Sequence, residues 1–195
     1  MLRSRFLPAL SMLASLTVAA VGSAAEYVLD AEHSNVQFSV PLMAVSKVTG
    51  KFMRYDVKLF AGKARDLSQA SVTAVIQMGS VDTGNDAWDA KLKTPAFFDA
   101  GHYPEIRFQS RQVRKVGGRW EAIGPLTLHG VTKEITLPFT IEGRFEEPTA
   151  DEHVGIQAAF SFDRRDYGMA WSGNTGAKTV GHKVTVDIAL LATRK

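Results

Sequence analysis

The chain has 195 residues, no cysteine and a formal net charge of only +3. The lack of cysteine excludes disulfides, thiol catalysis and thiolate metal ligands. The small charge, with no run of lysine and arginine between aromatic residues, gives no indication of a nucleic-acid partner. The length fits a single domain with a sizeable core.

Residues 1–25 have the organisation of an export signal. Arg3 and Arg5 form a basic start, no further charge occurs before Glu26, and Ser23-Ala24-Ala25 fits a signal-peptidase site. A retained membrane anchor is the alternative, because the uncharged run is nearly long enough to span a bilayer. The small-residue ending favours cleavage. We therefore expect a mature domain of residues 26–195 with a formal net charge of +1.

Apolar and polar residues alternate with a period of two along most of this domain, which is typical of half-buried antiparallel strands. Gly117-Gly118 and His129-Gly130 each separate two such runs and predict hairpin turns. A closed up-and-down barrel of eight strands would accommodate the pattern and remove exposed sheet edges. The predicted strands cover residues 36–42, 53–60, 72–78, 106–110, 120–128, 131–142, 154–162 and 184–190.

Between residues 84 and 103 the alternation stops, and residues 85–94 predict one short helical insertion. Asn85 is a suitable N-cap, acidic residues occupy the first turns, and Pro95 marks the end. Trp88 and Leu92 lie four residues apart and therefore share a face of this helix. With Phe97 and Phe98 they either plug one end of the barrel or wall the mouth of an internal cavity.

Asp99, His102 and Glu105 follow this insertion at three-residue intervals, a spacing that on a helix could gather metal ligands or an acid and a base. Gly101 and Pro104 interrupt any helix there. We therefore expect the three side chains to diverge. No His-x-x-x-His pair or nucleophile elbow occurs elsewhere, and we predict neither a catalytic residue nor a metal site.

Several segments, in this order, resemble the YceI-like family over nearly all of the mature chain. They are HSNVQFSVPLMAVSKVTGKF (33–52), LKTPAFFD (92–99), YPEIRFQS (103–110), LTLHGVTKEITLPF (126–139) and FDRRDYGM (162–169). The resemblance implies an eight-stranded antiparallel lipocalin-like β-barrel, exported to the bacterial periplasm. It also implies a tunnel for a long polyisoprenoid lipid, such as an isoprenoid quinone or a polyprenyl phosphate.

The chain departs from the family pattern near the expected tunnel mouth. The family commonly has a histidine near Pro41, an arginine at the position of Trp88, a histidine at that of Lys91 and an aspartate at that of Ala96. These changes remove polar groups and add aromatic area. They leave the identity of the bound headgroup open.

We therefore predict a periplasmic lipid-binding or carrier protein with no cofactor other than its bound lipid or quinone. Lys91 and Lys93 are candidate headgroup contacts, although solvated lysines are common on exposed helices. Two alternatives stay open: an enzyme that uses Asp99, His102 or Glu105, and a filled barrel that docks on a membrane redox protein. Contact with a membrane and a homodimer also stay open. The predicted ligand-binding residues are Phe38, Val40, Leu42, Trp88, Leu92, Phe97, Phe98 and Phe108.

Overall fold

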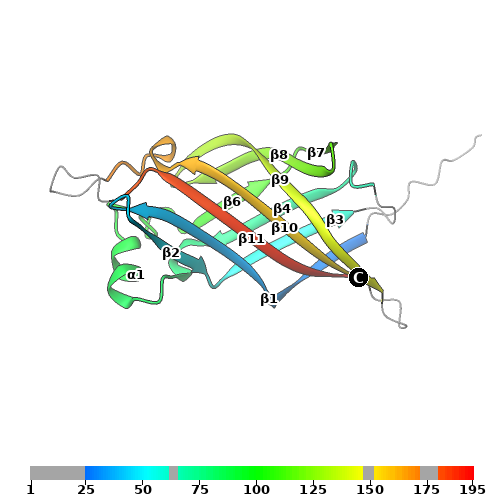
Figure 1. Cartoon of the computed structure of the whole chain (residues 1–195), viewed down its shortest axis with the longest axis horizontal. Coiled ribbons are helices and arrows are strands. Elements are labelled where there is room, and N and C mark those ends of the chain that lie inside the picture. Colours follow the sequence, from blue (N-terminus) through cyan, green and yellow to red (C-terminus); the bar gives the residue numbers. More distant parts are fainter. Residues whose placement is uncertain (1–24, 62–65, 147–151, 172–179) are drawn as a thin grey trace, which may run out of the picture.

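The computed structural model describes residues 25–61, 66–146, 152–171 and 180–195 as a β-barrel with one α-helix (Figure 1). The predicted export signal, apart from its last residue, lies outside the described residues. The strands are β1 (Ala25–Leu42), β2 (Ser46–Phe52), β3 (Tyr55–Ala61), β4 (Ser71–Gln77), β5 (Val81–Asp82), β6 (Glu105–Gln109), β7 (Gln112–Val116), β8 (Arg119–Leu128), β9 (Val131–Glu146), β10 (Glu152–Asp163) and β11 (Lys183–Arg194).

The barrel is closed by antiparallel pairing around the ring β1-β3-β4-β6-β8-β9-β10-β11, with β11 returning to β1. Eight strands in chain order confirm the predicted up-and-down barrel. Successive side chains of a strand point to opposite faces, so that alternate residues of each strand face the barrel interior. Both predicted hairpin turns are confirmed, and Gly117 and Gly130 have the positive φ angles that such turns require.

At the end of the barrel where β1 finishes, the neighbour of β1 is β2 instead of β3. β2 also pairs with the short strand β5. β2 and β3 resemble one strand interrupted by a bend, because both pair with β1 and only Met53 and Arg54 separate them. The prediction of a strand at residues 53–60 was therefore wrong at its start. β2 was not predicted because its inward positions are Val48, Gly50 and Phe52, and the glycine interrupts the apolar alternation.

The predicted helical insertion is confirmed as α1 (Asp86–Leu92), and Asn85 is its N-cap. The Asn85 side-chain oxygen accepts a hydrogen bond from the backbone N–H of Trp88 at 3.1 Å. Asp89 accepts from the backbone N–H and the hydroxyl of Thr83, which ties the helix to the segment after β5. α1 lies beside one end of the barrel, hereafter the α1 end (Figure 1).

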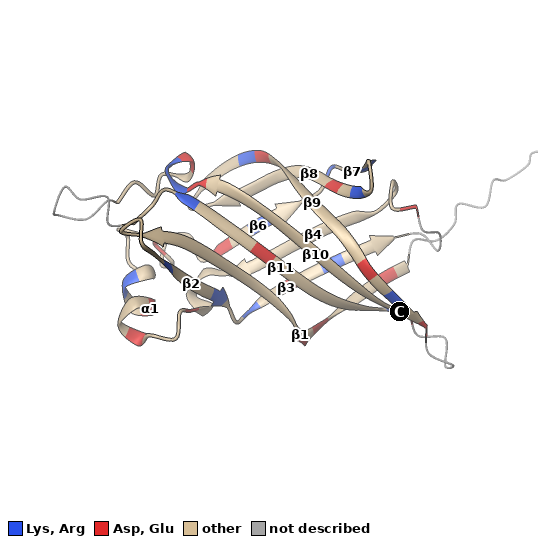
Figure 2. Ribbon diagram, viewed as in Figure 1, with Lys and Arg blue, Asp and Glu red and all other residues tan. Residues whose placement is uncertain are grey.

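Two short 3₁₀ turns, η1 (Met78–Ser80) and η2 (Arg164–Tyr167), also follow strands. Lysine, arginine, aspartate and glutamate positions are scattered over the described strands and both ends (Figure 2). Within the described ranges, no helix is long and apolar enough to cross a membrane.

Candidate functional site

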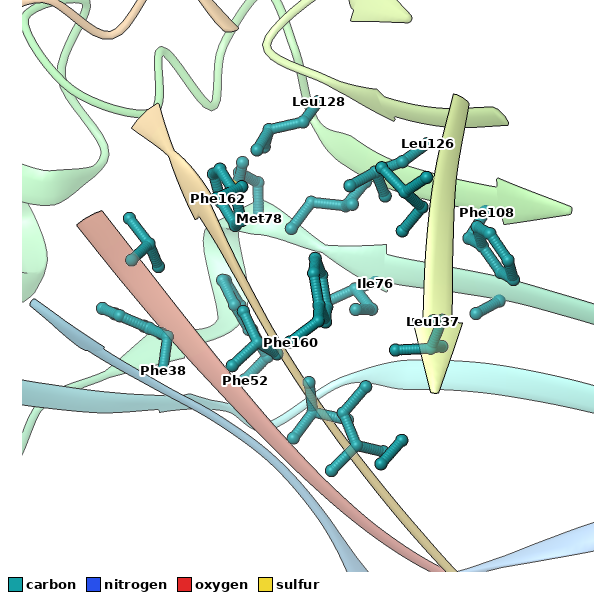
Figure 3. Close-up of a pocket in the computed structure, with 18 of the residues that line it drawn as sticks. Phe38, Phe52, Ile76, Met78, Phe108, Leu126, Leu128, Leu137, Phe160 and Phe162 are labelled. Atoms are coloured by element: carbon teal, nitrogen blue, oxygen red, sulfur yellow. The ribbon is translucent and has the colours of Figure 1, made fainter. Parts of the chain in front are cut away.

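The inward side chains do not fill the barrel but leave a cavity of about 210 Å³ (Figure 3). Its wall draws apolar side chains from every strand of the ring. They are Val36, Phe38, Val40, Val57, Leu59, Val72, Ala74, Ile76, Ile106, Phe108, Ala122, Leu126, Leu128, Ile135, Leu137, Phe139, Ile156, Ala158, Phe160, Phe162, Val184, Val186, Ile188 and Leu190, with Val48 and Phe52 of β2.

The size of this cavity limits what it encloses. One water molecule needs about 10–15 Å³ of cavity space and has a share of about 30 Å³ in the liquid. The cavity therefore has room for about 7 to 20 groups of the size of a water molecule or a methylene. That corresponds to a short apolar chain or to part of a longer one.

The cavity wall is almost wholly apolar, and Arg164 of η2 is the one charged residue among the described residues that line it. Its guanidinium donates to the backbone carbonyls of Met169, Val180 (3.3 Å) and Gly181 (2.9 Å). Burial lowers the pKa of Arg164, and the nearby negative charge of Asp163 partly offsets this lowering. Arg164 thus fastens η2 to the segment before β11 and leaves almost no polar surface for a ligand inside the cavity.

At the α1 end the cavity wall is made by the helix and the turns that follow it. Trp88, Leu92, Ala96, Phe97 and Phe98 line the cavity there. The backbone N–H of Phe98 donates to the carbonyl of Leu92 at 2.9 Å, which folds the chain back over the end of the helix.

The Phe98 ring completes an aromatic cluster with two strand residues. Its centroid lies 6.0 Å from that of Phe38 and 6.2 Å from that of Phe52. Phe38 packs against Gly50 of β2, where an added Cβ would lie 2.6 Å from the ring. Glycine at position 50 is therefore needed for this ring to occupy the wall.

Lys91 lies over three aromatic rings at the outer side of the same end. Its Nζ atom is 5.1 Å from the ring centroid of Trp88, 5.7 Å from that of Phe97 and 4.8 Å from that of Trp171. Cation–π attraction of this kind holds an exposed ammonium group in place. A positive charge is therefore fixed next to the cavity wall, whereas Lys93 is exposed and its only described electrostatic neighbour is Asp89.

The structure places seven of the eight predicted ligand-binding residues in the cavity wall and leaves Leu42 outside it. Leu42 shares the inward face of β1 by its spacing, but it is the last residue of that strand. It pairs with Ser46 at the start of β2 and with Val180 across the barrel rim. Leu42 therefore lies at the rim, beyond the cavity wall.

Sequence reasoning did not select several wall residues, among them Phe160, Phe162 and Met78. The alternation of β10 places Phe160 and Phe162 on one face and could have identified them. Arg164 lies in a segment that carries the family resemblance, but no local pattern assigns its side chain to the cavity. Trp171 lies outside any periodic segment, so nothing in the sequence indicates its contact with Phe97, at 4.6 Å between centroids.

The expectation that Asp99, His102 and Glu105 diverge was wrong for the first two residues. The His102 Nδ1 lies 2.9 Å from an Asp99 carboxylate oxygen, because Asp99 adopts a positive φ of 47° and turns the chain back. Glu105 instead accepts from Gln77 at 2.9 Å and pairs with Arg107. His102 is exposed, and none of the three lines the cavity.

No group of three histidine, cysteine or acidic residues that could hold a metal occurs in the described part of the chain. The Asp99–His102 pair therefore lacks a third such ligand there. It caps a surface turn in which the backbone N–H groups of His102 and Tyr103 both donate to the Asp99 carbonyl.

The opposite end of the barrel contains a buried carboxylate, Glu152, at the start of β10. Glu152 accepts a hydrogen bond from the Tyr27 hydroxyl at 2.9 Å, pairs with Arg144, and lies 3.9 Å from Arg194. Burial raises the pKa of Glu152, but these hydrogen bonds and positive charges outweigh it and hold the pKa below its ordinary value. Burial and Glu152 together raise the pKa of Tyr27.

The model of the YceI-like domain matches residues 27–192. A UPF0312 protein of Pectobacterium atrosepticum is 32% identical over 165 residues, which cover 84% of this chain and 84% of the relative. A UPF0312 protein of Staphylococcus aureus is 31% identical over 164 residues, which cover 83% of this chain and 93% of the relative.

Solved structures show the same fold. Burkholderia cenocepacia BcnA aligns with a TM-score of 0.74 at 19% identity, over 84% of this chain and 98% of that chain. A Campylobacter jejuni YCEI protein aligns with a TM-score of 0.69 at 25% identity, over 77% and 87%. A polyisoprenoid-binding domain from Saccharophagus degradans aligns with a TM-score of 0.61 at 18% identity, over 87% and 98%.

Proposed function

The chain belongs to the YceI-like family, and we propose that it is a periplasmic protein that binds and carries a lipid with a polyisoprenoid tail. The observation that carries this proposal is the cavity inside a closed barrel, with a wall that is almost wholly apolar. Such a wall favours hydrocarbon and offers no partner to a polar group. The Saccharophagus degradans domain of the same fold, described as polyisoprenoid-binding, supports this class of ligand.

Burial of the tail supplies the affinity. Each buried methylene contributes about 0.8 kcal/mol, so ten enclosed carbons contribute about 8 kcal/mol before other terms. The loss of translational and conformational freedom offsets a large share of this gain. Micromolar affinity is then within reach without any charged contact inside the barrel.

The cavity volume divides the lipid into two parts. About 7 to 20 carbons of the tail fit inside, which is about one to four isoprene units. The headgroup and any longer part of the tail remain outside, because the wall has almost no polar surface to receive a headgroup. Lys91 is fixed beside the wall at the α1 end and is positioned to attract an anionic headgroup such as a phosphate.

The same reasoning favours a binding protein over an enzyme. In the one described acid–imidazole pair from the candidate trio, His102 faces solvent, and neither Asp99 nor His102 lines the cavity. A tail held inside the barrel therefore does not meet that pair. We place the protein in the periplasm on the strength of the predicted export signal, where a carrier would shield a tail from water between two membranes. A homodimer and a membrane redox partner remain predictions.

The proposal is tested by uptake of added prenyl lipids, with two substitutions on one strand as a matched pair. Ala158 of β10 lines the cavity, while the next residue, Ala159, faces out. Ala158→Phe fills cavity volume and lowers affinity for farnesol and longer prenols at least tenfold, by the loss of enclosed methylenes. Ala159→Phe leaves affinity unchanged. The proposal is wrong if the native protein takes up neither prenols nor quinones, or if both variants bind as it does.

A further inference from the structure

The turn between β1 and β2 combines two features that are each unfavourable for a soluble protein. Met43 and Ala44 form its centre with φ angles of 51° and 60°, and the Val45 N–H donates to the Leu42 carbonyl at 3.2 Å. Both residues are thus in the left-handed region, which side chains disfavour. Asparagine and glycine are the usual residues in such a two-residue turn.

The second feature is the exposure of apolar side chains at the tip of this hairpin. Met43 is 60% exposed and Val45 is 88% exposed. Water therefore surrounds two large apolar side chains, and at Met43 the backbone conformation also disfavours a side chain. A turn of polar residues would be more stable in both respects, so its residues point to a contact that the isolated chain does not show.

The hairpin tip belongs to the end of the barrel where the cavity is walled by α1. The chain directly before the tip contacts the rim, since the Gly181 N–H donates to the Pro41 carbonyl at 2.7 Å. β1 ends at the end of the barrel where α1 lies (Figure 1). Trp88 and Trp171, a residue type that concentrates at membrane–water interfaces, are half-buried at this end.

Lysines flank the tip. Lys47 pairs with Pro41 on the neighbouring strand, Lys91 lies in the last turn of α1, and Lys93 is the C-cap of that helix. All three are exposed, and none forms an ion pair with a carboxylate of the described residues. Of the two aspartates of α1, Asp89 is occupied by hydrogen bonds from Thr83. Anionic lipid headgroups complement such lysines.

We propose that the β1–β2 tip, Met43 to Val45, inserts into the surface of an anionic lipid bilayer and docks the α1 end of the barrel there. The choice of a bilayer rests on the proposed function, because a carrier of an insoluble tail must collect it from a membrane. The apolar tip enters the headgroup region, the lysines contact anionic headgroups, and the cavity end faces the lipid. Docking by this tip does not itself require a bound ligand.

The test is sedimentation with vesicles of phosphatidylethanolamine and phosphatidylglycerol, using protein recovered from the periplasmic fraction. Met43→Ser together with Val45→Ser lowers vesicle affinity about tenfold, through the loss of two inserted apolar side chains. The matched control is Phe145→Ser. Phe145 is 63% exposed but lies at the opposite end, near Glu152. The control leaves vesicle affinity unchanged.

A second variant separates lost docking from lost folding. Met43→Asn together with Ala44→Gly introduces the residues that the turn geometry prefers. It raises the Tm by about 2–5 °C and lowers vesicle affinity about threefold. A more stable protein that docks less well cannot be explained by misfolding.

Three results would overturn the proposal: no vesicle binding by the native protein, equal binding by the native protein and the Met43→Ser/Val45→Ser variant, or a loss of binding in Phe145→Ser alone. A shift of that double variant from dimer to monomer with unchanged vesicle binding would assign the tip to a second copy of the chain and also overturn it. Farnesol uptake is measured in parallel. Uptake without vesicle binding refutes docking and leaves the carrier proposal intact, whereas vesicle binding without uptake refutes only the carrier.

Discussion

The two ends of the barrel are built from opposite chemistry. At the α1 end, aromatic rings of Trp88, Phe97 and Phe98 line the cavity and Lys91 lies over the outer rings. At the opposite end, Glu152 holds Tyr27 and Arg144 together across the interior. The first end is held by dispersion and apolar contact, which tolerate rearrangement. The second is held by directional charged hydrogen bonds, which do not.

Under the proposed carrier function, this difference would allow a closed barrel to stay folded while it exchanges a ligand. The Glu152 cluster joins residues that are far apart in the chain and fixes the ends of β1, β9 and β10 together. The strands can thus remain closed there while side chains move at the α1 end. We expect changes at the opposite end to alter stability, and changes at the α1 end to alter binding.

The largest expected effect comes from Glu152→Ala. The substitution leaves the partly buried Arg144 without its carboxylate, and breaking such a pair costs about 2–4 kcal/mol of the free energy of unfolding. Urea unfolding measures the change. Glu121→Ala is the control, because it breaks the exposed pair with Arg114 and costs less than about 1 kcal/mol. Equal losses in the two variants would show that the Glu152 cluster has no special role.

Tail length is expected to affect binding in two regimes. Affinity rises about tenfold with each isoprene unit while the unit still enters the cavity, after offsetting costs. It then levels off beyond about four units, which is the upper limit of the enclosed volume. Calorimetric titration with prenols of increasing length measures this. A continued rise up to eleven units would mean that the cavity opens far more than its wall indicates.

Much of the barrel interior was predictable from the sequence because alternation in a strand maps directly onto its two faces. Phe38, Val40 and Phe108 were placed on the inward face for that reason, and the structure puts them in the cavity wall. Leu42 follows the same alternation, but the strand ends there, and periodicity does not mark where a cavity ends. The stated family resemblance supplied the ligand class.

The remaining parts depend on contacts between distant residues or on unusual backbone. Glu152 and Tyr27 are 125 residues apart, and neither has a local signature of a buried cluster. The contact between Asp99 and His102 requires a positive φ at a residue other than glycine, which spacing does not predict. The apolar turn at Met43 and Ala44 likewise conflicts with the usual turn residues.

The Glu152 cluster also predicts a dependence of stability on pH. The pKa of Glu152 is lowered in the folded state, so the unfolded chain binds its proton more readily. Its contribution is present above about pH 4.5 and is lost as the pH falls through the folded-state pKa. Glu152→Gln keeps the size of the side chain and removes this part of the dependence. Urea denaturation of the native protein and of Glu152→Gln at pH 7 and pH 3.5 measures this dependence. An equal loss of unfolding free energy in the two proteins between these pH values would contradict the assignment to Glu152.

The smallest expected effect is that of Lys91→Ala at the α1 end. Affinity for a polyprenyl phosphate falls about threefold, in line with one exposed charge contact, and affinity for the uncharged polyprenol does not change. Lys115→Ala is the matched control. Lys115 is also an exposed lysine beside an aromatic ring, since its Nζ atom lies 5.6 Å from the ring centroid of Trp120, but it belongs to β7. Equal effects of Lys91→Ala on both lipids would exclude a headgroup contact.

The most direct test of the carrier account is native mass spectrometry of the protein recovered from the periplasm, followed by organic extraction of whatever it releases. The account predicts one bound molecule per barrel, with a mass that matches a prenyl-tailed lipid, and its absence from the Ala158→Phe variant. An empty native barrel that also takes up no added prenol or quinone would contradict it.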